Sequence, residues 1–246
     1  MEQEFLILSI AIFGAATLQS ATGIGFGVIA GPVLLVILND SAAIQVSIIL
    51  NLLIAMLLAP SLRQKADRPL LSPLLLGLAI GTPLGLLIYL NMNIDMLKAF
   101  AGFVVLFTLI LVVRGKRASS PAAAPISGKF KQISIGAIAG VMGGSLAMPG
   151  PVPAAWMSAA GYRQETIRAT ILLMFVFAYT VALVLQFSVA GISAETLRLC
   201  VVHTPATVAG VLVGGVLSTR ISEQVFRCLL MAILASTAAI LFATIG

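Results

Sequence analysis

Glycine, hydroxyl and amide residues gather at two places in this chain, and the combination could bind a small anion. In the first place the polar residues precede the glycines: Gln19, Ser20, Thr22, Gly23, Gly25 and Gly27. In the second place a hydroxyl follows the glycines: Gly143, Gly144 and Ser145. Glycine lets a ligand approach the backbone closely, and hydroxyl and amide groups donate hydrogen bonds to an oxyanion without a fixed buried charge. We therefore take these residues as candidate substrate ligands.

The spacing of the glycines also fits a purely structural role. Gly23 and Gly27 are four residues apart, as are Gly140 and Gly144, and the same spacing recurs at 77, 81 and 85 and at 210 and 214. Small residues at this spacing let membrane helices pack closely. We interpret the last two sets as packing stripes. At the first two sets serine and proline accompany the glycines, which favours a substrate site.

Three further polar residues lie within apolar runs. Asn51 could meet either the substrate or another helix. Arg168 could bind the anion, pair with Glu165 or extend to the membrane interface. Asn51 and Arg168 each follow a proline of the glycine-rich clusters by 19 residues, which suggests equivalent positions. His203, the only histidine, raises the hypothesis of proton coupling, and its alternative is a neutral ring hydrogen-bonded between helices.

Groups for catalysis, metals or cofactors do not assemble in this sequence. The acidic residues around the apolar segments all lie near segment ends: Asp40, Asp95, Glu165 and Glu195. An intramembrane enzyme would need a paired acid and base at depth. Cys200 and His203 are too few for a metal site, and no Gly-Lys-Ser phosphate loop is present. We therefore expect no enzyme activity, no metal and no cofactor.

The elements that position these residues are predicted to be membrane helices. Of 246 residues, 60% are hydrophobic and only 9% are charged, whereas soluble domains carry about 25% charged residues. The apolar runs reach the length of about 20 residues that a crossing needs, and they lack the alternation of barrel strands. The predicted class is an all-α integral membrane protein, a polytopic helical bundle. Because Lys and Arg lie in short loops, the net charge of +6 indicates orientation in a lipid bilayer, not nucleic-acid binding.

Two apolar segments, 5–38 and 132–162, are too long for one straight crossing. A helix over the first would be about 50 Å long, against a hydrocarbon core of about 30 Å. Each contains glycine and proline, so we predict that each enters the membrane, breaks and turns back. Three crossings after each hairpin would then give two inverted repeats, 1–114 and 131–246, joined by a basic linker at 115–130. Glycines that recur 117 residues apart, at 23 and 140 and at 27 and 144, are a hint of this repeat.

The distribution of Lys and Arg predicts the orientation. If both long segments turn back, 12 of the 14 Lys and Arg residues lie on one side, and if both cross, only 9 do. The positive-inside rule favours the first arrangement. The N- and C-termini are then outside, in the periplasm, and the linker is cytoplasmic. We expect a multi-pass protein of the cell inner membrane.

The glycine-rich motifs resemble those of a known transporter family. GIGFGVIAGPVL at 23–34 is similar to the first signature of the TauE/SafE family, also called the sulfite exporter or 4-toluene sulfonate uptake family, and GGSLAMPGP at 143–151 is similar to its repeat. The resemblance covers essentially the whole chain. It implies a secondary carrier for sulfite, sulfoacetate or related organosulfur anions. The second half departs from the usual pattern at Met142, Met148, Pro151 and Pro153.

These observations lead to one functional prediction with two rivals. We expect a secondary transporter of small organosulfur oxyanions, working as an exporter by alternating access between the two halves. Because no nucleotide-binding motif is present, a proton or another ion gradient, the substrate's own gradient or a partner must supply the energy. The alternatives are a non-transporting membrane scaffold or subunit, and an anion channel. The sequence leaves monomer and homodimer open.

Overall fold

Ten helices make up the part of the chain that the computed structural model describes, which is residues 2–23, 25–114, 128–217 and 223–245. They are α1 (Glu2–Thr22), α2 (Phe26–Leu38), α3 (Ala42–Leu62), α4 (Arg68–Asn91), α5 (Ile94–Arg114), α6 (Lys129–Leu146), α7 (Pro151–Ala159), α8 (Gln164–Val189), α9 (Ala194–Leu217) and α10 (Glu223–Ala243). No strand occurs within these residues, so the all-α prediction is confirmed.

Six of these helices are long and apolar enough to cross a membrane: α1, α3, α4, α5, α8 and α9. Large apolar side chains point outward from them, such as Phe103, Val201 and Leu212, which are 63%, 70% and 66% exposed. Such a surface would be unstable in water and is stable against lipid tails. The chain is therefore a polytopic helical membrane protein.

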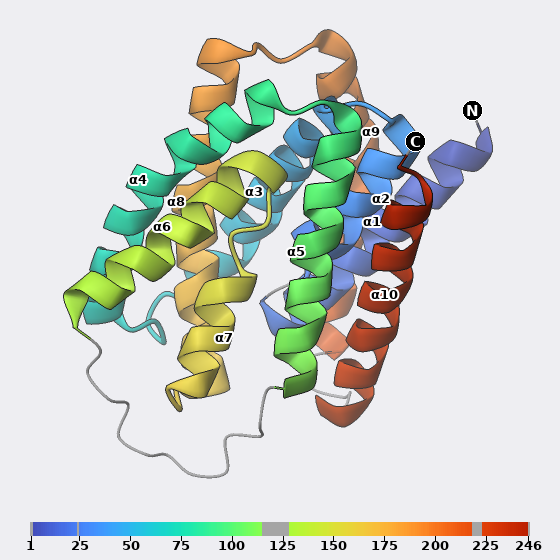
Figure 1. The fold of residues 1–246 in the computed structure, drawn as a ribbon. Coiled ribbons are helices and arrows are strands. Elements are labelled where there is room, and N and C mark those ends of the chain that lie inside the picture. The colour runs from blue at the N-terminus through green and yellow to red at the C-terminus, as the bar shows by residue number, and fades with distance from the viewer. Residues whose placement is uncertain (1, 24, 115–127, 218–222, 246) are drawn as a thin grey trace.

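Both overlong segments are broken. The first divides into α1 and α2 and the second into α6 and α7. In Figure 1, α2 runs back toward the side on which α1 begins, and α7 runs back toward the side on which α6 begins. The two hairpins therefore enter the bundle from opposite sides, as the sequence analysis predicts.

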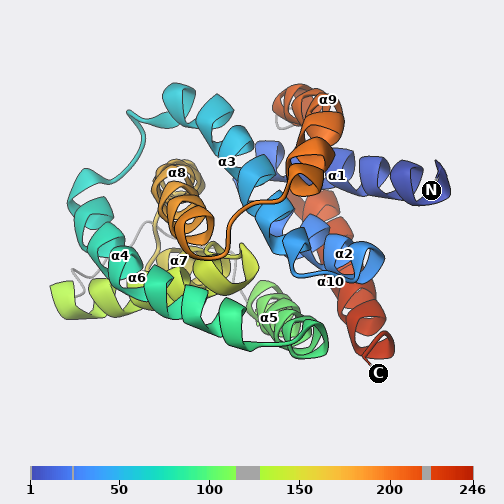
Figure 2. The same ribbon diagram turned by 90° about the horizontal axis from the view of Figure 1, so that it is seen from above.

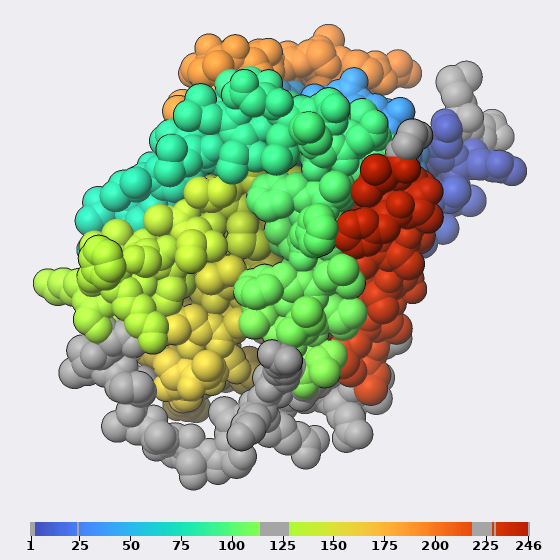
Figure 3. All heavy atoms as spheres, in the orientation of Figure 1, coloured from blue at the N-terminus to red at the C-terminus, as the bar shows by residue number. Residues whose placement is uncertain are grey.

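The most extensive helix contacts join the two halves of the chain. α1 packs along α9, and α6 packs along α4, while α3 packs on α8 and α5 packs on α10. Figures 2 and 3 show α4 and α6 side by side, and α5 beside α10. Each hairpin's first helix thus lies against a helix of the other half, so each half is held by the other.

Glycine stripes make the α4–α6 and α1–α9 contacts possible. A Cβ at Gly77 or Gly81 would overlap carbonyl oxygens of α6, and a Cβ at Gly210 or Gly214 would overlap those of α1. No residue other than glycine lets the backbones approach this closely. The packing interpretation of these two stripes is confirmed.

The helix ends divide the charges between two sides of the bundle. The α3–α4 loop, the end of α5 and the starts of α6 and α8 lie together at the bottom of Figure 1. The N-terminus, the C-terminus and the α2–α3, α4–α5 and α8–α9 loops lie at the top. The start of α10 lies at the bottom as well, and nine described Lys or Arg positions belong to this first side: Arg63, Lys65, Arg68, Arg114, Lys129, Lys131, Arg163, Arg168 and Arg227. Only Lys98 and Arg198 belong to the second, and the basic linker at 115–127 lies outside the described residues.

The 117-residue spacing of the sequence repeat does not align the two breaks. α1 ends at Thr22 and α6 ends at Leu146, which are 124 residues apart. Gly140 and Gly144 lie inside α6, where each packs on the backbone of α4. The sequence comparison therefore matched glycines of a break with glycines of a packing stripe. For the same reason Asn51 and Arg168 are not equivalent, since Asn51 is in the middle of α3 and Arg168 is in the second turn of α8.

Candidate functional site

Two glycines form the break between α1 and α2. Gly23 has a φ of +87° and Gly25 a φ of +148°. Residues with a Cβ rarely adopt these values, so glycine is what allows the chain to leave α1 and start α2 within a few residues. Both glycines are buried. The break is therefore an ordered feature inside the protein.

Gln19 joins the two sides of this break. Its side-chain oxygen accepts a hydrogen bond of 2.9 Å from the backbone N–H of Phe26, the first residue of α2. Its side-chain nitrogen Nε2 is fully buried and has no acceptor among the described residues. A buried donor without an acceptor is costly. The side-chain N–H groups of Gln19 are therefore available to donate to a ligand beside the start of α2.

Arg168 reaches the same break from α8. Its Nη2 donates a short hydrogen bond to the backbone oxygen of Ser20. A Cβ at Gly23 would lie 2.5 Å from Cγ of Arg168, so the side chain packs directly over the break. Its Nε is buried and has no partner among the described residues. Glu165 pairs with Lys65 at 3.4 Å, so the alternative of an Arg168–Glu165 pair is not what the structure shows.

The start of α2 adds backbone donors to the same place. The first amides of a helix have no acceptor within it, and they form the positive end of the helix dipole. The backbone N–H of Phe26 donates to Gln19 Oε1, and the backbone N–H of Ile29 donates to the oxygen of Gly25. Gly27 and Val28 also belong to this first turn of α2. The start of a helix is a known kind of anion site, and here the unpaired side-chain donors of Gln19 and Arg168 lie at the break that precedes it.

The other hydroxyls of the first motif are used within the structure. Ser20 Oγ donates to the backbone oxygen of Val211 at 2.7 Å. Thr22 Oγ1 donates to the backbone oxygen of Leu18, also at 2.7 Å. Ser20 and Thr22 thus lie beside the break, and both hydroxyl groups donate to backbone carbonyl oxygens.

The second motif presents carbonyl oxygens and not amides. Gly143, Gly144 and Ser145 form the last turn of α6, whose amides are inside the helix. The oxygen of Gly143 accepts from Ala147 N at 3.1 Å, and the oxygen of Gly144 accepts from Gln186 Nε2 at 3.3 Å. Ser145 Oγ donates to Val141 O within the same helix. These residues end a helix and do not begin one, so their backbone amides lie inside α6 and do not face the break.

The helix that follows this second break also lacks donors. α7 begins at Pro151, and its third residue is Pro153. Proline has no N–H, so two of the first three amides of α7 are missing. These are the same prolines at which the sequence departs from the family pattern. The start of α7 therefore offers fewer backbone donors than a helix start without proline does.

The two breaks nevertheless touch. A Cβ at Gly27 would overlap the backbone oxygen of Ala147, which has a φ of +59° and ends α6. One turn further along α2, Gly31 lies beside Met148 and Ser47 at ordinary contact distances. Tyr179 of α8 donates its hydroxyl to the oxygen of Ala147 at 3.1 Å. The start of α2 is therefore packed directly on the second break.

Asn51 lies on α3 near this contact. It is fully buried, and its Nδ2 donates to the oxygen of Ser47 at 2.9 Å. Its Oδ1, Ser47 Oγ and Gln186 Oε1 have no partner among the described residues. Ser47 and Gln186 were missed by the sequence reasoning, although a polar residue inside an apolar helix was a usable signal. They add polarity around the breaks.

His203 does not lie at the breaks. Its Nδ1 is 3.2 Å from Ser9 Oγ, and its ring stacks on Phe5 with centroids 5.2 Å apart. Ser9 precedes Gly23 by 14 residues, which is about 21 Å along a helix. His203 thus lies in the α1–α9 interface, as its structural alternative describes.

Neither of the two described pockets is at the breaks. One lies at the α3–α4 loop and α8, and the other lies on the opposite side, between Asp40, Tyr89 and Ser193. Within the described part of the chain no three His, Cys, Asp or Glu residues are grouped to hold a metal ion. At the breaks, the side chains of Gln19, Ser20, Asn51 and Ser145 are fully buried.

The comparisons with known proteins name a family. The family model described as "Sulfite exporter TauE/SafE" matches residues 8–241. The comparison with curated proteins and the comparison with solved structures gave no match. The matched region contains both breaks and every candidate site residue. This chain belongs to the TauE/SafE sulfite exporter family.

Proposed function

We propose that the chain is a secondary transporter that exports a small organosulfur oxyanion, such as sulfite or a sulfonate, and binds it at the α1–α2 break. Membership of the family supports transport of this class of anion. The observation that carries the site is the pair of buried donors without acceptors at the α1–α2 break, Gln19 Nε2 and Arg168 Nε. Oxyanions accept hydrogen bonds on several atoms, so one anion could satisfy these donors together.

In this proposal Arg168 supplies the main attraction and Gln19 the selectivity. A charge pair at about 4 Å contributes about 4 kcal/mol at an effective dielectric near 20. Part of that energy is offset by removing the anion from water. Gln19 Nε2 and the amides of Gly27 and Val28 then replace hydration without adding charge. Weak net binding is what a carrier needs, since the anion must also leave.

The packed break supports a carrier over a channel. A channel needs a continuous aqueous path, whereas Gly27 is packed on Ala147 and both described pockets end short of this contact. In a carrier these helices separate on one side at a time. We further propose that the two halves, 1–114 and 131–246, are inverted repeats that move against each other. The basic side is cytoplasmic in the cell inner membrane, and both termini are outside. Monomer and homodimer fit this proposal equally.

Flux in proteoliposomes tests the proposal. Purified protein is reconstituted, and uptake of radiolabelled sulfite and of a labelled sulfonate is measured with and without unlabelled anion inside. A carrier gives saturable uptake that internal unlabelled anion accelerates. A scaffold gives no uptake above empty vesicles, and a channel gives uptake without saturation or acceleration. Either of these last two results would reject the proposal.

Arg168→Gln locates the site within the same assay. We expect it to raise the KM for sulfite at least about tenfold, which corresponds to about 1.4 kcal/mol. Arg163→Gln is the matched control, since Arg163 is exposed one turn earlier at the start of α8. Thermal unfolding of both variants separates a loss of binding from a loss of folding. If the folded Arg168→Gln protein kept the wild-type KM, the site would not be at this break.

A further inference from the structure

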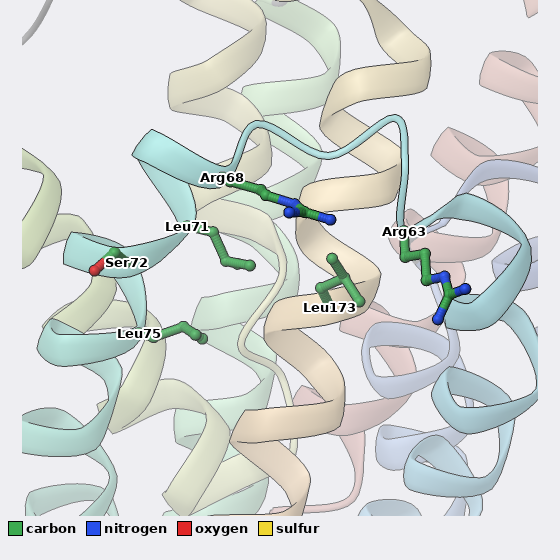
Figure 4. A pocket seen from close by; sticks show the side chains of 6 residues that line it. All are labelled: Arg63, Arg68, Leu71, Ser72, Leu75 and Leu173. Carbon is green, nitrogen blue, oxygen red and sulfur yellow. The ribbon is translucent and has the colours of Figure 1, made fainter.

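We propose that a groove between α4 and α8, on the side that carries most Lys and Arg residues, binds one anionic phospholipid. The groove has a volume of about 440 Å³ and is lined by six residues: Arg63, Arg68, Leu71, Ser72, Leu75 and Leu173. It lies beneath the loop that joins α3 to α4 (Figure 4). It is separate from the α1–α2 break and is not required by the transport proposal.

The groove has a charged end and an apolar wall. Leu71 and Leu75 come from successive turns of α4, and Leu173 faces them from α8. In Figure 4, Arg68 extends from the start of α4 across the groove toward α8. Arg63 lies at the other end of the connecting loop and points away from Arg68. Arg68 is thus the side chain placed to hold a phosphate, and Arg63 adds positive potential nearby.

This combination fits an amphiphile better than a small anion. Three leucines offer contacts that a sulfite-sized anion cannot use, whereas a lipid chain can lie along them. The same helix also carries lipid-facing surface, since Leu76 and Ile80 of α4 are each 54% exposed. A basic pocket between helices at the membrane surface is a recognised site for anionic headgroups. The phosphate of a zwitterionic lipid is accompanied by the lipid's own ammonium group, so an anionic lipid gains more from the charge of Arg68.

Hydrogen bonds and an ion pair hold the loop above the groove, and the nearby carboxylates of Asp67 and Glu165 take part in them. Asp67 caps α4 by accepting from Leu70 N at 3.1 Å, and its own N–H donates to Thr170 of α8 at 3.2 Å. Lys65 pairs with Glu165. Among the described residues, neither Arg63 nor Arg68 forms an ion pair with a carboxylate. The guanidinium group of Arg68 is therefore available to a phosphate in a preformed site, and the charge of Arg63 adds to the positive potential there.

Lipid titration of the purified full chain tests this inference. Bound phosphatidylglycerol and phosphatidylcholine are counted by native mass spectrometry, with each lipid added separately in detergent. A basic side chain near an anionic lipid contributes about fivefold to binding, so losing both arginines should weaken phosphatidylglycerol binding about 30-fold. Arg68→Gln should account for the larger part, because Arg68 lies across the groove. The double variant Lys129→Gln with Lys131→Gln is the matched control, since it removes two exposed charges from the start of α6 on the same side.

A second variant tests the apolar wall. Leu173→Trp fills the groove while keeping both arginines, and it should also lower phosphatidylglycerol binding. Soluble glycerol phosphate and sulfite serve as competitors, and neither should displace the lipid. The inference is overturned if phosphatidylcholine binds equally well, or if the arginine and lysine variants lose binding alike. Full displacement by sulfite or glycerol phosphate would also overturn it, because the groove would then be a site for small anions.

Discussion

Replacing Gly27 by alanine should push the two helix breaks apart, whereas the same change at Gly31 should be tolerated. The two glycines lie one turn apart on α2. A Cβ at Gly27 would overlap the backbone oxygen of Ala147, and backbone atoms in a packed break cannot rotate away as a side chain can. A Cβ at Gly31 would lie 3.5 Å from Met148 Cε and 3.6 Å from Ser47 Oγ, which are ordinary contact distances.

The expected difference between the two variants can be estimated from the overlap. Alanine is the better helix former by about 1 kcal/mol, and both variants share this gain. Overpacking costs about 1–3 kcal/mol and applies to Gly27→Ala alone. For a chain of this length about 1 kcal/mol corresponds to about 2–4 °C in Tm. Gly27→Ala should therefore unfold about 2–12 °C below Gly31→Ala.

Thermal unfolding in detergent and sulfite flux in proteoliposomes measure this difference. Gly27→Ala should lose stability and most of its flux, because the start of α2 is displaced from the proposed site. Gly14→Ala is a further control, since no atom lies within 4 Å of the Cβ position of Gly14 in α1. If Gly27→Ala and Gly31→Ala had equal Tm and equal flux, the contact between the two breaks would be refuted.

Three further substitutions separate site residues from packing residues. Gly23→Ala should abolish sulfite flux, because its Cβ would meet Arg168 Cγ at 2.5 Å and its φ of +87° costs a residue with a Cβ about 1–2 kcal/mol; wild-type flux would contradict this. Ser145→Ala should leave the KM for sulfite unchanged, since the hydroxyl bonds to Val141 O in its own helix; a raised KM would return Ser145 to the site. His203→Gln should leave the pH dependence of flux unchanged, since the ring is in the α1–α9 interface; a lost pH dependence would restore proton coupling through His203.

Composition and segment length were sufficient to predict the class of fold. A chain with 9% charged residues cannot cover a water-facing surface, and the lengths of segments 5–38 and 132–162 required breaks. The stripes at 77, 81, 85 and at 210, 214 were correctly read as packing, because close helix contacts constrain residue size in a regular pattern. Each of these inferences depends on a property of one segment alone.

The breaks were harder to locate because glycine has two uses in this fold. Gly23 and Gly25 supply backbone angles that end α1, while Gly140 and Gly144 supply room for α4. The sequence pattern is the same in both cases, and only the partner helix distinguishes them. The sequence also did not show which end of a helix faces each break, because a glycine pattern does not distinguish free amides from free carbonyl oxygens. At Gly143 it is the carbonyl oxygen that faces the break, where it accepts from Ala147 N.

The roles of Gln19 and Arg168 could be proposed from the sequence but not assigned. Both residues were named as candidates, yet nothing in the sequence places α8 beside the end of α1. That neighbourhood depends on how the two halves pack, which brings Arg168 over Gly23. The partners also reduce the three possible roles of Arg168 to two, since Glu165 pairs with Lys65.

A crystal structure with bound selenite, the heavier analogue of sulfite, tests the central claim most directly. Selenium scatters anomalously, so its position can be found without interpreting the surrounding density. We predict one anomalous peak beside the start of α2, within hydrogen-bond distance of Gln19 Nε2 and Arg168 Nε. A protein that transports sulfite but shows its selenite peak elsewhere, or an α1–α2 segment that is one unbroken helix, would contradict the account.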